Sequence, residues 1–213
     1  MFTGIVQETG KIVSMTAAAE GVTFRFETGR LGSLLQVGHS ISVDGVCLTV
    51  TQVGPGWVEV DATPETLRRS NLGEKQVGSL LNLEPPLRLA DFLGGHLVQG
   101  HVDATGRIDS VREEGNSWIF RFSAPAEILR YCVPKGSVTV NGISLTISGL
   151  GPDFFEVAII PHTWEVTNLA QLKPGDTVNL EADVISKYVE SHIQNYMRGV
   201  RAPDPGVGAD VES

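Results

Sequence analysis

The sequence contains no apolar run that approaches the roughly 18 residues needed to cross a membrane. Its opening stretch, residues 1–8, shows no basic region followed by an apolar segment, so we predict no signal peptide. Only two cysteines, Cys47 and Cys132, occur among 213 residues, too few for a disulfide framework. We expect both to be reduced thiols in a cytoplasmic protein.

Several signatures of cofactor chemistry are also missing. There is no phosphate loop, no dinucleotide glycine fingerprint and no Gly-x-Ser-x-Gly nucleophile elbow. No paired histidine or cysteine motif of a zinc site occurs. The formal net charge is -9, which argues against nucleic acid or an anionic membrane as a partner. We therefore expect neither cofactor nor metal.

What the sequence does have is a long internal repeat at an offset of 97 residues, which becomes 96 near the start of each copy. A repeat of this length indicates a duplicated domain rather than a solenoid unit. Two related domains carry two related pockets, an arrangement that suits chemistry between two copies of one molecule. The repeated pairs are Val43–Val50 with Val140–Ile147, Pro64–Glu84 with Pro161–Glu181, and Gly4–Ser14 with Gly100–Ser110.

Short strands and turns dominate both halves. Polar and apolar residues alternate in Thr23–Phe26 and, in part, in Ser117–Phe122, as is typical of strands. The dipeptides Asp44-Gly45 and Asn141-Gly142 are strong signals for tight hairpin turns. With 24 glycines and frequent turn signals, each half is predicted to form a small antiparallel Greek-key barrel, so the fold class is mainly β.

Few helices are expected. An amphipathic helix over residues 185–198 has no counterpart in the first half, and its apolar stripe either mediates oligomerisation or packs against a barrel. The predicted division is a first barrel over 1–97, a second over 98–184, this helix, and a disordered tail over 199–213. Shorter helices or turns are predicted for Arg30–Gln36, Pro64–Arg69, Pro125–Cys132 and Pro161–Val166.

The segment Gly94–Asp103 holds two histidines, His96 and His101. They are five residues apart and would point to opposite faces of a strand, so they make a poor metal site. One histidine is enough for acid–base catalysis, although spacing alone favours an ordinary strand histidine. The repeat aligns His101 with Ile5, so the two halves differ in chemistry at that point.

The repeat also aligns Cys47 with Ser144, which places a thiol opposite a hydroxyl. Thr49 and Thr146 are equivalent residues as well. A small buried cysteine without a reactive role is the commoner alternative for Cys47, and no basic neighbour in sequence activates its thiol.

These same segments carry a resemblance to the riboflavin synthase α-chain family, over residues 1–197. The resemblance rests on Met1–Gln7, Gly45–Val50, Thr66–Leu72, Gly94–Val102 and Gly142–Thr146. It implies two tandem six-stranded barrels and a C-terminal helix through which three chains assemble. It implies the dismutation of two 6,7-dimethyl-8-ribityllumazine molecules, by four-carbon transfer, to riboflavin and 5-amino-6-ribitylaminouracil. It further implies that no cofactor takes part and that each working site joins barrels of neighbouring chains; association with lumazine synthase is a further expectation.

By position, the resemblance assigns two substrate pockets. The first is expected to comprise Gly4, Ile5, Val6, Cys47, Leu48, Thr49, Asp61, Ala62, Thr63, Pro64, Glu65 and Thr66. The second is expected to comprise Gly100, His101, Val102, Lys135, Ser144, Leu145, Thr146, Ala158, Ile159, Ile160, Pro161, His162 and Thr163.

The catalytic residues are expected to be few. His101 and Thr146 would move protons, Ser144 or Cys47 would act near the addition step, and Phe2 would close the site over the ring. The chain departs from the family pattern at Asn141, where some members have Asp, and at His162, where Glu is common.

The main rival interpretation is a non-catalytic lumazine- or flavin-binding antenna protein on the same barrels. Such relatives lack the stretch that here runs from Gly94 to His101, so its presence favours the enzyme. A flavin-reductase type of barrel would need a separate nucleotide-binding half, and this sequence encodes none.

Overall fold

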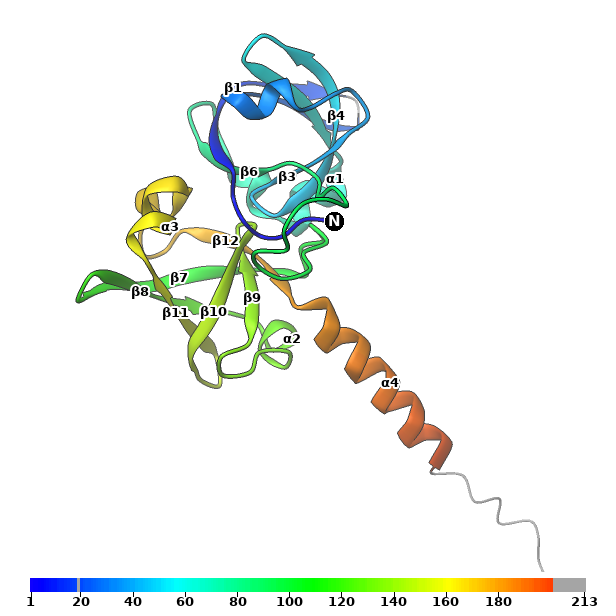
Figure 1. Cartoon of the computed structure of the whole chain (residues 1–213), viewed down its shortest axis with the longest axis vertical. Helices are drawn as coiled ribbons and strands as arrows, with labels where there is room; N and C mark the ends of the chain where they lie inside the picture. The colour runs from blue at the N-terminus through cyan, green and yellow to red at the C-terminus, as the bar shows by residue number, and fades with distance from the viewer. Residues whose placement is uncertain (19, 201–213) are drawn as a thin grey trace, which may run out of the picture.

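The computed structural model describes residues 1–18 and 20–200. Within this part, two closed six-stranded antiparallel barrels lie side by side and a long helix projects away from them (Figure 1). The predicted fold class is therefore confirmed. Among the described helices, none is long and apolar enough to cross a membrane.

The first barrel is closed in the order β1-β2-β5-β4-β3-β6. Its strands are β1 (Glu8–Ala18), β2 (Gly21–Glu27), β3 (Ser40–Val43), β4 (Val46–Gly54), β5 (Trp57–Ala62) and β6 (Leu80–Glu84). Three short helical turns accompany them: η1 (Arg30–Ser33), α1 (Pro64–Arg69) and η2 (Asn71–Glu74).

The second barrel repeats this closure in the equivalent order, written as β10-β11-β8-β7-β12-β9. Its strands are β7 (Ala104–Glu114), β8 (Ser117–Ser123), β9 (Ser137–Val140), β10 (Ile143–Leu150), β11 (Phe154–Ile159) and β12 (Thr177–Ala182). Its helical turns are α2 (Ala126–Leu129), α3 (Pro161–Val166) and η3 (Asn168–Gln171).

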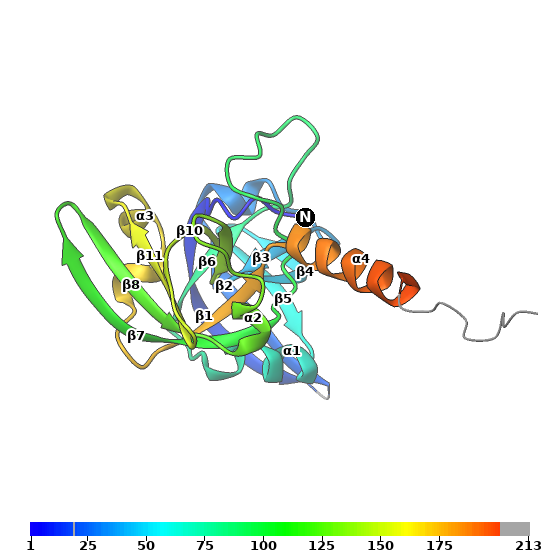
Figure 2. The same ribbon diagram turned by 90° about the horizontal axis from the view of Figure 1, so that it is seen from below.

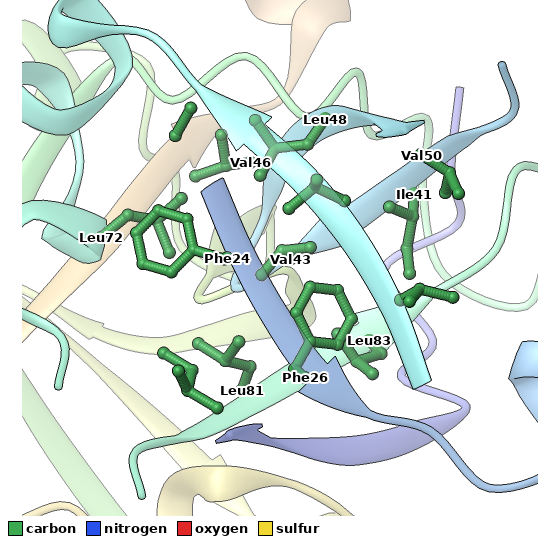
Figure 3. Packing of buried hydrophobic residues seen from close by; sticks show 14 of the residues in the cluster. Phe24, Phe26, Ile41, Val43, Val46, Leu48, Val50, Leu72, Leu81 and Leu83 are labelled. Carbon is green, nitrogen blue, oxygen red and sulfur yellow. The ribbon is translucent and has the colours of Figure 1, made fainter. Parts of the chain in front are cut away.

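Each barrel is filled by the inward-facing side chains of its strands. In the first, Phe24 and Phe26 of β2 meet Leu81 and Leu83 of β6 across the interior (Figure 3). Phe120 and Phe122 occupy the corresponding place in the second. Because the cores fill the barrel interiors, ligand-binding groups must lie on the outer faces.

The predicted hairpin turns are present and abut each other at the contact between the barrels. Asp44 and Gly45 both have positive φ, as do Asn141 and Gly142, which is the geometry of a type I′ turn. A Cβ on Gly45 would stand 2.6 Å from the backbone nitrogen of Gly142. Glycine is required there because two backbones meet.

The predicted helices form, with adjusted ends. Pro64–Arg69 and Pro161–Val166 are found as predicted, whereas those predicted at Arg30–Gln36 and Pro125–Cys132 are shorter. Helix α4 (Val184–Val200) continues two residues beyond the predicted end, so residues 199 and 200 are helical instead of belonging to the tail. The rest of the predicted tail, 201–213, lies outside the described residues.

Candidate functional site

Two equivalent strands present polar side chains on the outer faces of the barrels. In β4, Leu48 and Val50 are buried in the core while Thr49 is exposed and Cys47 is half-buried. In β10, Ser144 and Thr146 take the same outward positions, because successive side chains of a strand point to opposite faces. The side chains of Leu48 and Leu145, both expected in the pockets, belong to the cores instead.

In both closed barrels, strand pairing is incomplete at the same place beside these strands. Among the described residues, the register of β4 against β5 starts at Val50↔Val60, and that of β10 against β11 starts at Ile147↔Val157. Before these pairs no ladder joins the two strands among the described residues. Backbone edges at 47–49 and 61–63 in one barrel, and at 144–146 and 158–160 in the other, are therefore not paired with each other. Such edges can hydrogen-bond the rim of a planar heterocycle.

The segments that precede β1 and β7 cross over between the barrels. Gly4, from the first half, accepts a hydrogen bond at its carbonyl oxygen from the Ser144 amide, 2.8 Å away. Gly100, from the second half, accepts one from the Cys47 amide at the same distance. Val6 accordingly packs against the core of the second barrel and Val102 against that of the first.

This crossover corrects the predicted composition of the pockets. Residues 4–6 line the Ser144 side and residues 100–102 line the Cys47 side, the reverse of the predicted grouping. His101 therefore accompanies Cys47 rather than Ser144. The residues are equivalent, as the repeat indicates, but each segment serves the opposite barrel.

Close approach explains why both crossing segments carry glycine at this point. Gly4 has φ +76° and Gly100 has φ +77°, a left-handed conformation that glycine adopts readily. A Cβ would stand 2.6 Å from Ser144 Cβ at the first position and 2.7 Å from Cys47 Cβ at the second. Any other residue would push the segment away from the pocket.

Two buried glutamates bind the backbone of the crossing segments. Glu84 accepts hydrogen bonds from the amides of Thr3 and Gly4, at 2.6 and 3.0 Å. Glu181 accepts them from the amides of Gln99 and Gly100, at 2.7 and 3.0 Å. Burial raises the pKa of both carboxyls, to about 7 for Glu181, against the lowering effect of these amides.

His96 contacts Ser144 directly, a contact that the sequence does not reveal. Its Nδ1 lies 2.7 Å from Ser144 Oγ, and its Nε2 lies 3.1 Å from Thr139 Oγ1. With the ring proton on Nε2, Nδ1 accepts the Ser144 hydroxyl, the arrangement of a nucleophile and its base. Burial lowers the pKa of His96, so the ring is neutral near pH 7.

Cys47 is the residue of the first half that is equivalent to Ser144. Among the described residues, no histidine is hydrogen-bonded to the Cys47 thiol as His96 is to Ser144, so the two sites differ in basic chemistry.

Phe2 is fully buried and does not offer a surface that could close over a ligand. Its backbone pairs with Val98 in both directions, at 2.7 and 3.1 Å, and its ring lies 3.0 Å from where a Cβ on Gly100 would be. Phe2 therefore supports the crossing segment from behind, which corrects its expected role.

Lys135 has φ +66° although it is not glycine, at the position where the first barrel has Gly38. Its side chain is exposed, and its amide donates to Ile147 of β10 at 2.9 Å. A side chain in this conformation is uncommon outside glycine, and the place of Lys135 in the second pocket stays a prediction.

The remaining expected residues lie at the ends of β5 and β11 and in the helices that follow. Thr63 caps α1, since its hydroxyl accepts the Thr66 amide at 3.2 Å. Glu65 is exposed and hydrogen-bonded to Arg68 and Arg69, which lowers the pKa of its carboxyl. His162, at the equivalent place, is exposed on α3.

Asn141 lies at the contact between the barrels rather than in a pocket. Its Oδ1 accepts the Asn179 amide at 2.8 Å and Asn71 Nδ2 at 3.2 Å. Its departure from the family pattern therefore concerns domain contact and not the groups around a ligand.

A hollow of about 630 Å³ lies beneath the loop between β6 and β7 that stands clear of the barrels in Figure 2, and Thr3, Ile5 and Glu84 are among the residues that line it. Of the residues expected in the pockets, only Ile5 lines it. In the part of the chain that the structure describes, no group of three or more His, Cys, Asp or Glu residues could hold a metal ion.

The fold and the paired sites define a protein built from two tandem lumazine-binding domains: the model of the lumazine binding domain matches residues 3–85 and again 99–183. Riboflavin synthases are similar over most of their length. The riboflavin synthase of Mycobacterium tuberculosis is 49% identical, over 89% of this chain and 96% of its own length. That of Bacillus subtilis is 38% identical, over 89% of this chain and 88% of its own length. The chain belongs to the riboflavin synthase family.

The fold is also that of LumP. LumP structures complexed with 6,7-dimethyl-8-(1'-D-ribityl) lumazine and with riboflavin match with TM-scores of 0.78 and 0.80. They are 22% and 23% identical and cover 85% of this chain and 99% of theirs.

Proposed function

We propose that the protein converts two molecules of 6,7-dimethyl-8-ribityllumazine into riboflavin and 5-amino-6-ribitylaminouracil by transfer of four carbons. The observation that carries the proposal is the pair of equivalent open strand ends, one next to Cys47 and the other next to the Ser144–His96 contact. One compound fits both places, while unequal side chains let one molecule donate and the other accept.

The reaction needs a proton removed from the 7-methyl group of one substrate and a nucleophile added at C7 of the other. His96 is neutral, and its Nδ1 lies 2.7 Å from Ser144 Oγ. It takes the Ser144 proton as that oxygen adds to C7; if a water adds instead, Ser144 receives the water's proton while it passes its own to His96. His101 and Thr146, exposed beside the two strands, are the proposed groups that move the remaining protons. Holding the two substrates together supplies the proximity that the second-order reaction lacks.

The proposed assembly is a homotrimer in which the first barrel of one chain faces the second barrel of the next. Support comes from α4, which projects from the barrels (Figure 1) and, by the exposure of its side chains, presents a row of large apolar residues. Exposed apolar surface of this kind favours a protein partner. These residues are Ile185, Tyr188, Val189, Ile193, Tyr196 and Met197.

Equilibrium sedimentation tests the assembly. The whole chain is expected at three times its 22.8 kDa mass, and a variant with Ile193→Asp and Tyr196→Asp at one time that mass. An active monomer would contradict a site shared between chains. We also expect a cytoplasmic location, in keeping with two free cysteines, and association with lumazine synthase, to be checked by co-sedimentation.

Incubation of the purified protein with 6,7-dimethyl-8-ribityllumazine alone tests the reaction. Riboflavin, followed by its absorbance, is expected at one molecule for every two substrates consumed, without any added cofactor. Binding of the lumazine with altered fluorescence but without formation of riboflavin would instead support the second candidate, the antenna-type protein. The likeness to LumP is the observation that favours this candidate.

A further inference from the structure

Glu84 and Glu181 stand at equivalent positions, at or next to the end of the last strand of each barrel. Both side chains are buried, with 5% and 2% of their surface exposed. Among the described residues, neither forms an ion pair with an arginine or lysine. Each carboxylate instead accepts hydrogen bonds from two consecutive backbone amides, and Glu84 also accepts one from the Thr3 hydroxyl at 2.7 Å. Burying a carboxylate is costly, so this repeated arrangement needs a reason beyond filling space.

The reason lies in what the amides belong to. Glu84 is part of the first barrel, yet the amides it binds lead into residues 4–6, which line the Ser144 pocket of the second. Glu181 is part of the second barrel, and its amides lead into residues 100–102, beside Cys47 of the first. Each carboxylate thus binds the amide of the same glycine, Gly4 or Gly100, whose carbonyl contacts the opposite pocket.

The two crossing segments also bind each other. Phe2 and Val98 exchange two backbone hydrogen bonds, and the His96 amide donates to the Thr3 carbonyl at 3.1 Å. A continuous backbone connection therefore runs from Glu84 through this short pairing to Glu181. Hydrogen bonds to a charged acceptor are the strong links in such a network.

We propose that Glu84 and Glu181 are positioning residues that fix each pocket from the opposite barrel: Glu84 orders the Ser144 pocket and Glu181 orders the Cys47 pocket. The proposal rests on the proposed function for its catalytic meaning. Its structural content, the crossed pairing of glutamate and pocket, can be tested without turnover.

The thiol of Cys47 reports on the segment that Glu181 holds. Gly100 contacts Cys47 through the 2.8 Å hydrogen bond and close packing at Cβ, so release of the segment uncovers the thiol. Cys132 serves as the slow internal reference, since it is buried and burial raises the pKa of its thiol to about 11.

The experiment measures the reaction of Cys47 with an aromatic disulfide reagent at pH 8 in the whole chain, with Glu181→Gln and Glu84→Gln as matched variants. Glutamine keeps the size but places an amide donor against a backbone N–H. We expect Glu181→Gln to raise the Cys47 rate about tenfold and Glu84→Gln to leave it within about twofold.

A mirrored background completes the test. In a chain carrying Cys47→Ser and Ser144→Cys, the reporter thiol lies in the other pocket, and now Glu84→Gln is expected to raise its rate while Glu181→Gln is not. Equal effects of both variants on both thiols, no effect of either, or the uncrossed pairing would each overturn the proposal. If a glutamine variant does not fold, Glu181→Asp and Glu84→Asp, which shorten the reach, replace it.

Binding of riboflavin to the glutamine variants, followed by fluorescence, tests whether the positioning role of the two glutamates affects ligand binding. Each variant is expected to weaken one class of sites about tenfold and to spare the other. If each glutamine variant speeds only the thiol of the opposite barrel but the protein does not turn over lumazine, the proposed function is wrong and the positioning role holds. If the protein turns over lumazine but the thiol rates do not show this pattern, the positioning role is wrong and the proposed function holds.

Discussion

Asp44 forms an ion pair with Lys75, 2.7 Å between Oδ2 and Nζ, at the contact between the barrels. The Asp44 side chain is fully buried and that of Lys75 is 13% exposed. The equivalent residues of the second half are Asn141 and Leu172, both uncharged. An otherwise symmetric contact, in which Asn82 pairs with Asn168 and Asn71 with Asn179, thus carries one buried charge pair.

The second half supplies the neutral substitute with which to measure this pair. Lys75→Leu alone is expected to lower the free energy of unfolding by about 3 kcal/mol, because it leaves the Asp44 carboxylate buried without its cation. Lys75→Leu with Asp44→Asn recreates the pair found in the other half and is expected to recover most of the loss. Urea denaturation of the wild type, both single variants and the double variant checks this. Additive losses would show that the two side chains do not interact.

His96 is predicted to matter more for turnover than His101. His96→Gln is expected to lower kcat by about 10²–10⁴-fold, because it removes the base that contacts Ser144, and to leave riboflavin binding nearly unchanged. Since the pKa of His96 lies below the usual histidine value, the acid limb of the wild-type rate profile is expected below pH 6.5. Rates of riboflavin formation between pH 5 and 8 check both points. A smaller loss for His96→Gln than for His101→Gln would contradict the assignment.

Cys47 and Ser144 are predicted to respond differently to substitution although they are equivalent by the repeat. Cys47→Ser is expected to keep kcat within about threefold, since among the residues that the structure describes no histidine is hydrogen-bonded to the thiol as His96 is to Ser144. Ser144→Ala is expected to lower kcat about a hundredfold or more by removing the hydroxyl that His96 contacts. Steady-state rates of both variants decide the matter; a severe loss in Cys47→Ser would move the addition step to the first pocket.

The outward position of these residues could be read from the sequence, because alternation in Cys47-Leu48-Thr49-Val50 follows from strand geometry. The Asp44-Gly45 and Asn141-Gly142 turns were equally accessible, since only a few dipeptides accept positive φ at two successive residues. Such features depend on neighbours in the chain.

The crossover could not be read in this way. A repeat states which residues are equivalent, and an exchange of segments between two equivalent barrels preserves that equivalence. Gly4 would align with Gly100 whether each lined its own pocket or the other one. The contact between His96 and Ser144 could not be predicted from the sequence either. It joins residues 48 positions apart through a segment that leaves one barrel and contacts the other.

The titration of Glu181 gives a prediction about stability and pH. Burial raises the pKa of Glu181 from 4.5 to about 7 in the folded protein. The charge of Asp103 also raises this pKa, whereas the cation Lys187 lowers it. Between pH 4.5 and pH 7 the Glu181 carboxyl is ionised in the unfolded chain but still largely protonated in the folded protein. Its contribution to stability is therefore complete below pH 4.5 and falls as the pH rises to 7. The wild-type minus Glu181→Gln difference in free energy of unfolding is therefore expected to decrease by roughly 3 kcal/mol between pH 4.5 and 8.

Subtraction of the variant removes the titration of distant groups, so urea denaturation of both proteins across this range isolates Glu181. Glu84→Gln is the matched control, because burial raises the pKa of Glu84 too. The wild-type minus Glu84→Gln difference in free energy of unfolding must therefore also decrease as the pH rises. A difference that grows with pH would mean that the two amides stabilise the Glu181 carboxylate by more than burial costs it. The pKa of Glu181 in the folded protein would then lie below 4.5, and the ionised glutamate would be the more stable form at every pH above that value.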